Sequence, residues 1–367
     1  MKHLIEIGSL FFKMGLTAFG GPAAHIAVME AEVVEKRGWM DKQEFLDLVG
    51  ATNLIPGPNS TEMTMHCGYV RAGYPGLIVA GAAFILPAAL LTAFVAWLYL
   101  QFGKFGDADT FLIGFRAAVG IVILEALIKL GKKALISPLT WALGIGTVVG
   151  FLFAVNPIYL ILAAGLVQLF GSKLIKSNQV FAPLLAVLPA LTNKSLFLSF
   201  LKIGSILFGS GYVLVAYLED ELVRKLGWLT QEQLLDSIAM GQFTPGPVLT
   251  TATFVGFILK GPMGALLATL GIFLPSFVFA GLLAPAVKKW SKLPFVRPLL
   301  NGINAAALGL MGGALIQLAY DNYFNWISGV LLVFTAIFRF GPKKLSPLIL
   351  IPLAGALGFL ISYIFVH

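Results

Sequence analysis

Two short segments combine a backbone break with polar side chains that can donate hydrogen bonds. They are Pro56-Gly57-Pro58, followed by Asn59, Ser60 and Thr61, and Pro245-Gly246-Pro247, followed by Thr250 and Thr251. Proline lacks a backbone donor and fixes φ, while glycine leaves the backbone between the two rings free. At membrane depth such a break is tolerated only where protein or a water-filled cavity covers it. The paired breaks therefore predict a functional site inside a membrane protein.

The chemistry predicted for these breaks is the binding of a small oxyanion. If each break is the tip of a re-entrant hairpin, the helix that follows points its free N–H groups and its positive dipole end at the centre. Helix N-termini with nearby hydroxyls are suited to an oxyanion, whereas a cation would need carbonyl or carboxylate oxygens. The alternative is that Pro-Gly-Pro only makes a tight kink. Its duplication favours a binding site.

Three basic residues lie inside apolar runs. Lys13 and Lys202 occupy equivalent positions in the two halves, and Arg116 lies in a later run. A basic residue at that depth costs about 2.5–3.5 kcal/mol, so it usually faces a cavity or a partner. We expect the lysines to attract an anion, although snorkelling to the interface is an equal alternative. Arg116 either clamps an oxyanion through two hydrogen bonds or pairs with Glu62 or Glu125.

Candidates for a proton-coupling group are few. Glu62 and Glu125 each lie in apolar surroundings, and His25 follows the break Gly20-Gly21-Pro22. A histidine can carry a proton near neutral pH, although a lone one is more often structural. Gly20 and Gly21, with their counterparts Gly209 and Ser210, complete the predicted site. One cysteine and two internal histidines predict no metal, and we expect no cofactor.

Composition sets the class of protein. Of 367 residues, 58% are hydrophobic and 11% are charged, against about 25% charged in soluble proteins. The net charge of +8 fits basic cytoplasmic loops better than nucleic-acid binding, because no aromatic-basic tract accompanies it. The sequence contains no Walker loop, Gly-x-Ser-x-Gly or His-Glu-x-x-His. A transporter is therefore expected rather than an enzyme, with a membrane-embedded enzyme as a remote alternative.

The chain repeats itself at an offset of 189 residues (245 minus 56), and after one deletion at 188. Matched pairs include Lys13 with Lys202, Trp39 with Trp228, Asp47 with Asp236, Pro87 with Pro275 and Gly114 with Gly302. So many matches at one offset predict a tandem duplication. We place the first repeat at residues 1–176, a linker at 177–194 and the second repeat at 195–367.

The expected fold is an all-α polytopic membrane protein of two inverted-topology repeats, each with about five transmembrane helices plus a re-entrant helical hairpin. The predicted spans are 4–28, 75–102, 110–129, 138–155 and 157–171, then 195–218, 262–286, 298–319, 325–338 and 346–366, with hairpins at 45–69 and 231–259. An odd number of spans inverts the second copy. The positive loops swap accordingly, since Lys129, Lys132 and Lys133 correspond to a loop with Asp321.

The first half carries the segments FFKMGLTAFGGPAAHIAVME, RGWMDKQEFLDLVGATNLIPGPNSTEMTMHCGY and GLIVAGAAFILPAALL. The second half carries FLKIGSILFGSGY and GWLTQEQLLDSIAMGQFTPGPVLTTATFVG. Together they resemble the chromate ion transporter family in its two-domain form, over nearly the whole chain. The second copy departs from the pattern at Ser210-Gly211, where the glycine-proline pair is missing, so its break is expected to be softer.

The resemblance implies a multi-pass protein of the bacterial cytoplasmic membrane that exports chromate. It implies a drive from the proton-motive force or from anion exchange. Sulfate shares the charge and shape of chromate, so a carrier of sulfate or another oxyanion is the alternative. The implied partners are the oxyanion and the lipid bilayer, without nucleic acid, and a homodimer is compatible with the sequence.

Overall fold

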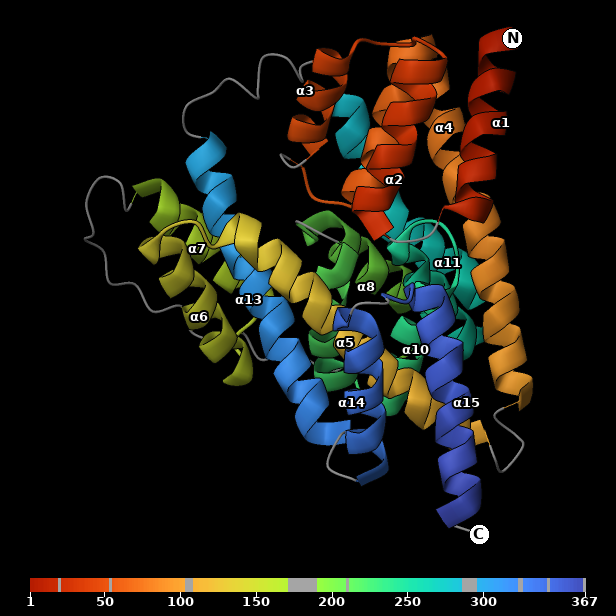
Figure 1. Ribbon diagram of the computed structural model, residues 1–367. Helices are drawn as coiled ribbons and strands as arrows, with labels where there is room; N and C mark the ends of the chain where they lie inside the picture. Colours follow the sequence, from red (N-terminus) through yellow and green to blue (C-terminus); the bar gives the residue numbers. More distant parts are fainter. Residues whose placement is uncertain are drawn as a thin grey trace.

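The computed structural model describes residues 1–18, 21–52, 55–102, 108–170, 190–208, 211–285, 296–322, 326–341 and 344–365. The described residues form helices joined by short turns (Figure 1), and the buried apolar side chains form one large core with a small satellite. Many large apolar side chains on the outside remain exposed, among them Leu90, Leu282 and Val333. That distribution is expected of helices that face lipid.

Each half begins with a helical hairpin in place of the predicted first span. In the first half, α1 (Lys2–Thr17) is followed by α2 (Gly21–Met29) and η1 (Glu30–Lys36). The chain reverses between α1 and α2, because Arg37 Nη1 and Trp39 Nε1 return to Glu6 Oε1 at 3.3 and 3.1 Å. The prediction that residues 4–28 cross as one span is therefore wrong, while the break predicted within it at Gly20-Gly21-Pro22 agrees with the start of α2 at Gly21. Pro22 is the second residue of α2, a position at which proline favours the start of a new helix.

The second half starts in the same way, with α8 (Asn193–Ile206), η2 (Gly211–Val213), α9 (Leu214–Leu218) and η3 (Glu219–Lys225). Tyr217 donates to the carbonyl of Ile206 at 2.8 Å, and Lys202 Nζ lies 2.6 Å from Glu221 Oε2. Both contacts join the two arms of one hairpin. The single span predicted at 195–218 is wrong for the same reason.

A second hairpin follows in each half, and it carries the Pro-Gly-Pro tip. In the first half its arms are α3 (Lys42–Thr52) and the start of α4 (Asn59–Phe102). The helix α4 is broken at Ala72 and Gly73, where Gly73 has φ 63°. Beyond the break the chain doubles back, because Gly68 and Gly76 touch through their backbones. The arm 59–71 is shorter than the roughly 20 residues of a span, and the part after Gly73 is the long membrane helix.

The second half repeats this construction with α10 (Gln231–Phe243), η4 (Val248–Thr250) and α11 (Thr251–Leu283). Lys260 and Gly261 break α11, with φ 61° at Gly261, and Gly256 touches Gly264. The hairpins predicted at 45–69 and 231–259 thus correspond to paired short arms. Only glycine allows both the left-handed turn and the backbone contact at these positions.

The remaining helices exchange between the halves. The first half adds α5 (Ala108–Ala134), α6 (Pro138–Leu152) and α7 (Pro157–Phe170); the second adds α13 (Val296–Asn322), α14 (Trp326–Phe340) and α15 (Pro347–Phe365). The pair α6 and α7 packs on α13, while α14 and α15 pack on α5. The contacts are reciprocal, because Gly114 lies against the backbone of Ala354 and Gly302 against that of Ala164. Each half therefore completes the other.

By length and composition, four helices among the described residues can cross a membrane: α4, α5, α11 and α13. The helices α6, α7, α14 and the 349–361 part of α15 are apolar but shorter. The all-helical membrane class is confirmed. The expectation of about five spans in each half is too high, because the first predicted span of each half is a hairpin of two short arms. In Figure 1 the N-terminus and α1 to α3 lie at the top, with α14 and α15 at the bottom.

Candidate functional site

The breaks of the two halves are joined by a reciprocal pair of backbone hydrogen bonds. Gly57, in the first Pro-Gly-Pro, donates to the carbonyl of Leu207 at 2.6 Å. Gly246, in the second, donates to the carbonyl of Ala18 at 3.0 Å. Ala18 and Leu207 are the residues that end α1 and α8, and they match one another at the repeat offset. Each Pro-Gly-Pro tip is therefore bonded to the end of the first helix of the other half.

Both central glycines adopt conformations that other residues avoid. Gly57 has φ 141° and Gly246 has φ 93°. A Cβ on Gly57 would overlap Glu62 Oε1 and would lie 2.6 Å from Ser276 Oγ. A Cβ on Gly246 would lie 2.5 Å from Ala88 Cβ. Glycine is thus required at each tip for two reasons: the backbone angle excludes other residues, and the opposite half approaches too closely for a side chain.

The first tip holds several buried polar atoms without a hydrogen-bond partner among the described residues. They are both carboxylate oxygens of Glu62, the hydroxyl oxygens of Thr61 and Ser276, and Nε2 of His66. Glu62, Thr61 and Ser276 are completely buried. Buried polar atoms are nearly always bonded in folded proteins, and exceptions require an explanation. This cluster is where a ligand, a water molecule or a proton has unsatisfied groups to bind.

At the second tip the threonine hydroxyls have hydrogen-bond partners. The hydroxyl of Thr250 donates to the carbonyl of Pro247 at 2.8 Å, and that of Thr251 donates to the carbonyl of Val248 at 2.8 Å. The hydroxyl groups of both predicted binding threonines therefore donate to carbonyls of the preceding turn and are not available to an anion in this conformation. At the first tip, the N–H groups of Thr61 and Glu62 are likewise bonded to the carbonyl of Pro58, at 2.8 and 3.1 Å. Two of the donors expected to face an anion are thus engaged in this conformation.

His25 lies beside the hydrogen bond between Gly246 and Ala18 that holds the second tip. Its Nε2 is 3.2 Å from the carbonyl oxygen of Ala18, the same oxygen that accepts from Gly246. Because a carbonyl only accepts, Nε2 carries the proton and Nδ1 of the neutral ring is an acceptor. That Nδ1 has no partner among the described residues. The ring packs edge-on against Phe84 at 5.5 Å, so His25 both supports the tip and keeps one free acceptor.

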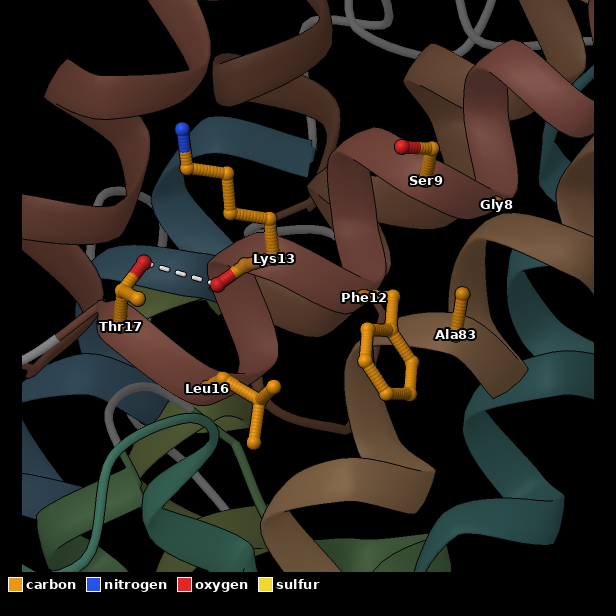
Figure 2. A pocket seen from close by; sticks show the side chains of 7 residues that line it. All are labelled: Gly8, Ser9, Phe12, Lys13, Leu16, Thr17 and Ala83. Carbon is orange, nitrogen blue, oxygen red and sulfur yellow. Dashed lines mark hydrogen bonds between the residues drawn. The ribbon is translucent and has the colours of Figure 1, made fainter.

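The two lysines at equivalent positions have different surroundings. Lys13 is exposed and lines a groove of about 620 Å³ beside α1, together with Phe12, Leu16 and Ala83. Its amino group points away from Phe12 and Ala83 (Figure 2), and it forms no ion pair with any described residue. Lys202 instead pairs with Glu221 at 2.6 Å. Only Lys13 therefore presents an uncompensated positive charge.

Arg116 pairs with neither Glu62 nor Glu125. It donates two hydrogen bonds to Asp236 of the second half, Nε to Oδ1 at 2.7 Å and Nη2 to Oδ2 at 2.9 Å. Tyr99 donates to the same carboxylate at 2.9 Å. The bidentate geometry predicted for an oxyanion is thus occupied by a carboxylate of the protein. The prediction for Arg116 is wrong because the packing of α10 on α5 brings Asp236 to Arg116, although the two residues are far apart in the sequence.

Glu125 is also engaged, because it accepts from Arg339 and lies 2.6 Å from Lys129 Nζ. Of the three proton-coupling candidates, Glu62 is thus the one carboxylate left without a partner among the described residues. Sequence reasoning missed Ser276, Asp236 and Arg339. The repeat match of Asp236 with Asp47 was the one available signal for them. Gly20, Gly209 and Ser210 lie outside the described residues.

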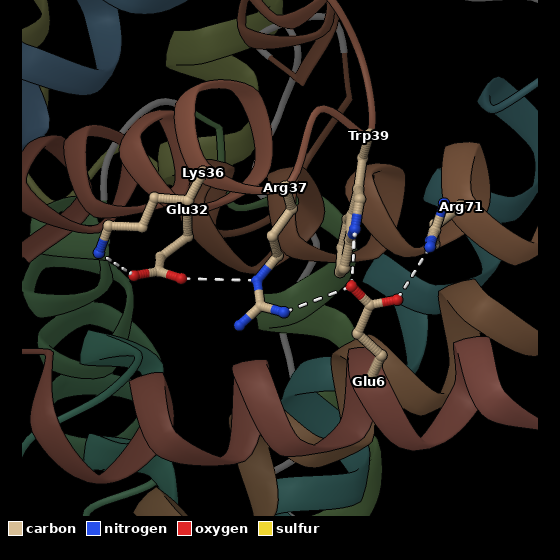
Figure 3. A network of polar contacts seen from close by, with 6 residues as sticks. All are labelled: Glu6, Glu32, Lys36, Arg37, Trp39 and Arg71. Atoms are coloured by element: carbon tan, nitrogen blue, oxygen red, sulfur yellow. Dashed lines mark hydrogen bonds and ion pairs between the residues drawn. The ribbon is translucent and has the colours of Figure 1, made fainter.

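A polar network closes the outer end of the first-half hairpins. Glu6 accepts hydrogen bonds from Arg37, Trp39 and Arg71, with Arg71 Nη2 3.0 Å from Glu6 Oε2 (Figure 3). Nearby, the hydrogen bond from Lys36 holds the pKa of Glu32 below its ordinary value, aided by the charge of Arg37. These contacts tie α1, the residues after η1 and the short arm of α4 to one another at this end of the hairpins. In the part of the chain that the structure describes, no group of His, Cys, Asp and Glu side chains could hold a metal.

Comparison with known proteins gives the relatives of this chain. The family model described as chromate transporter matches residues 5–169 and 194–359. The probable chromate transport protein of Synechococcus elongatus is 30% identical over 368 residues, covering 95% of this chain and 93% of that protein. The chromate transport protein of Cupriavidus metallidurans is 30% identical over 380 residues, covering 99% and 94%. That of Pseudomonas aeruginosa is 29% identical over 389 residues, covering 97% and 92%. No solved structure matches the chain.

Proposed function

This chain belongs to the chromate transporter family, and we propose that it is a secondary active transporter that exports chromate across the bacterial cytoplasmic membrane. It is a multi-pass membrane protein, as its family and its long apolar helices require. Relatives that are named chromate transport proteins support chromate as the substrate. A tetrahedral dianion is also the kind of ligand that backbone N–H groups at helix N-termini bind, and each Pro-Gly-Pro tip is followed by such a terminus.

The observation that carries the transport mechanism is the reciprocal latch at the tips. The hydrogen bonds Gly57 to Leu207 and Gly246 to Ala18 are the same bond made twice, once in each direction between the halves. A contact shared in this way has two equivalent ways to open. Separation of the tips on one side and then on the other is the motion that alternating access requires.

The residues proposed to bind the anion lie at these tips and around them. They are Gly20, Gly21, Pro56, Gly57, Pro58, Asn59, Ser60 and Thr61 in the first half, with Gly209, Ser210, Pro245, Gly246, Pro247, Thr250 and Thr251 in the second. Lys13 and Lys202 supply positive charge near the inner ends of their hairpin arms. For Thr250 and Thr251 to donate to the anion, the 3₁₀ turn that now holds their hydroxyls must rearrange, so this conformation is closed on its site.

We further propose that the two repeats have opposite orientations in the membrane. The reciprocal contacts of Gly114 with Ala354 and Gly302 with Ala164 support a two-fold relation between the copies. The exchange of basic loops between the halves supports an axis in the membrane plane. Inverted repeats with broken helices at the midplane are characteristic of secondary transporters.

The test is the chromate content of resting cells that express the protein, compared with a vector control, with and without excess sulfate. Less chromate in expressing cells, restored by an uncoupler, is the expected result. Relief of the effect by sulfate would assign sulfate to the same site. Unchanged or higher chromate would overturn export and direct attention to uptake of sulfate or another oxyanion.

A further inference from the structure

The two Pro-Gly-Pro tips share one backbone frame but differ in chemistry. In the first tip, a Cβ on Gly57 would meet two side chains, Ser276 of the other half at 2.6 Å from Oγ and Glu62 at Oε1, so both approach the same point beside Gly57. At the repeat offset, Ala88 stands where Ser276 would be and Thr251 where Glu62 would be. Ala88 has no polar group, and the hydroxyl of Thr251 is bonded to its own helix. At these two matched positions, an ionisable side chain therefore occurs at the first tip and not at the second.

The histidines show the same asymmetry. His25 and His66 are both buried in the first half, and their counterparts are Leu214 and Val255. A binding site for the anion alone would use both tips alike, because the backbone donors are duplicated. The extra groups of the first half therefore serve a purpose that the second half does not share.

Among these groups of the first half, Glu62 is the carboxylic acid that is buried without a donor or a positive charge beside it among the described residues. It is completely buried, and neither carboxylate oxygen has a partner among the described residues. A charged carboxylate in that position would be desolvated without any donor, whereas a protonated acid is neutral. A metal cation would need a set of oxygen ligands, and no group of suitable side chains occurs among the described residues. A proton needs no further ligand.

We propose, on the basis of the proposed transport function, that Glu62 carries the coupling proton and that Ser276 is its neighbour at the Gly57 tip, across the interface between the halves. The proton is bound while the Gly57 tip packs against the second half, because the carboxyl group is then completely buried. When the tip withdraws and water enters, Glu62 releases the proton. Ser276 belongs to the opposite half, so the same movement that opens the latch to Leu207 also removes the neighbour of the carboxyl group.

The other ionisable groups on α4 and on the helices packed against it are His66, Cys67, Tyr69, Arg71, Tyr74 and Tyr99 on α4; Lys2, His3, Glu6 and Lys13 on α1; His25 on α2; Lys42, Glu44 and Asp47 on α3; Glu232 and Asp236 on α10; and Lys260 on α11. Among the described residues, none forms a hydrogen bond or ion pair with Glu62. His66 lies one helical turn from Glu62 on the same helix, so it is the competing carrier.

The experiment uses the full chain in proteoliposomes at alkaline pH, where chromate itself stays a dianion. One assay measures exchange of labelled chromate with no gradient, and the other measures accumulation driven by an imposed pH gradient with the membrane potential clamped. Glu62→Gln keeps the size of the side chain but cannot release a proton. We expect it to retain exchange and to lose gradient-driven accumulation by about tenfold or more.

The matched control is Asp47→Asn, which neutralises an exposed carboxylate on the other arm of the same hairpin. It should leave both activities unchanged. Ser276→Ala should keep coupling but shift the pH at which accumulation is half-maximal. His66→Gln tests the competing carrier, and whatever its effect on exchange, accumulation should still respond to the pH gradient.

The outcomes separate the two claims. Absence of both exchange and accumulation in the unmodified protein would overturn the proposed transport function. Exchange without any response to the gradient, gradient-driven accumulation that survives Glu62→Gln, or its loss in His66→Gln alone would overturn the proton role of Glu62. Loss of exchange together with accumulation in Glu62→Gln would place Glu62 on the anion path and overturn that role as well.

Discussion

Arg116 on α5 and Asp236 on α10 form a buried, bidentate ion pair that joins the first half of the chain to the second. The two hydrogen bonds measure 2.7 and 2.9 Å, and the exposed fractions of the residues are 8% and 1%. Glu232 Oε1 lies 3.7 Å from the same guanidinium. A pair of this kind holds its partners in one register, because the planar fork of arginine matches both carboxylate oxygens.

We predict that Asp236→Asn strongly destabilises the protein. Removing one partner of a buried pair leaves an uncompensated charge, which costs about 3–5 kcal/mol in the free energy of unfolding. Thermal unfolding in detergent measures the effect. The repeat counterpart gives the control, since Asp47→Asn at an exposed position should change the free energy of unfolding by less than about 0.5 kcal/mol. Equal effects of the two substitutions would show that the ion pair does not hold the halves together.

A second prediction concerns the glycine of the first tip. In Gly57→Ala the new methyl group would overlap Glu62 Oε1 and crowd Ser276 Oγ at a backbone angle of φ 141°. Overpacking alone costs about 1–3 kcal/mol, so we expect a lower yield of folded protein and loss of transport. Gly50→Ala on the preceding arm is the control, because nothing lies within 4 Å of its Cβ. A fully active Gly57→Ala protein would contradict the close contact at the tip.

The two equivalent lysines give a third prediction. Lys13 faces a groove without an ion-pair partner among the described residues, while Lys202 is paired with Glu221. We therefore expect Lys13→Ala to reduce chromate export more than Lys202→Ala, and the double substitution to abolish it. Export is measured in cells, with the amount of protein in the membrane measured in parallel. Undiminished export by the double variant would remove both lysines from the mechanism.

The single cysteine supplies a native probe of movement. Cys67 is completely buried on the short arm of α4, five residues after Glu62. In the closed conformation we expect its alkylation by a water-soluble maleimide to be slower than in denatured protein by at least about tenfold. Chromate that drives opening of this hairpin should change the labelling rate. Rapid labelling in the absence of substrate would show that the first-half hairpin is not closed in the resting protein.

The sequence alone determined the membrane class, the duplication and the interruption of the helices at the two Pro-Gly-Pro segments. Those features are local or repetitive, since hydrophobicity, proline and glycine act on the backbone where they stand. The match of Asp47 with Asp236 and of Lys13 with Lys202 could also be read directly. Sequence reasoning failed at 4–28 and 195–218, because an apolar run long enough to span is equally compatible with two short arms that lie side by side.

Only the tertiary structure decided which groups meet. Arg116 finds Asp236, Gly57 finds Leu207, and Glu62 lies beside a serine more than two hundred residues away along the chain, at Ser276. These contacts cross from one half to the other, so no local pattern encodes them. The same packing assigns different chemistry to equivalent positions: Lys202 acquires a carboxylate partner, while Glu62 is buried without one. Whether a charged side chain is paired depends on neighbours that only the folded chain brings together.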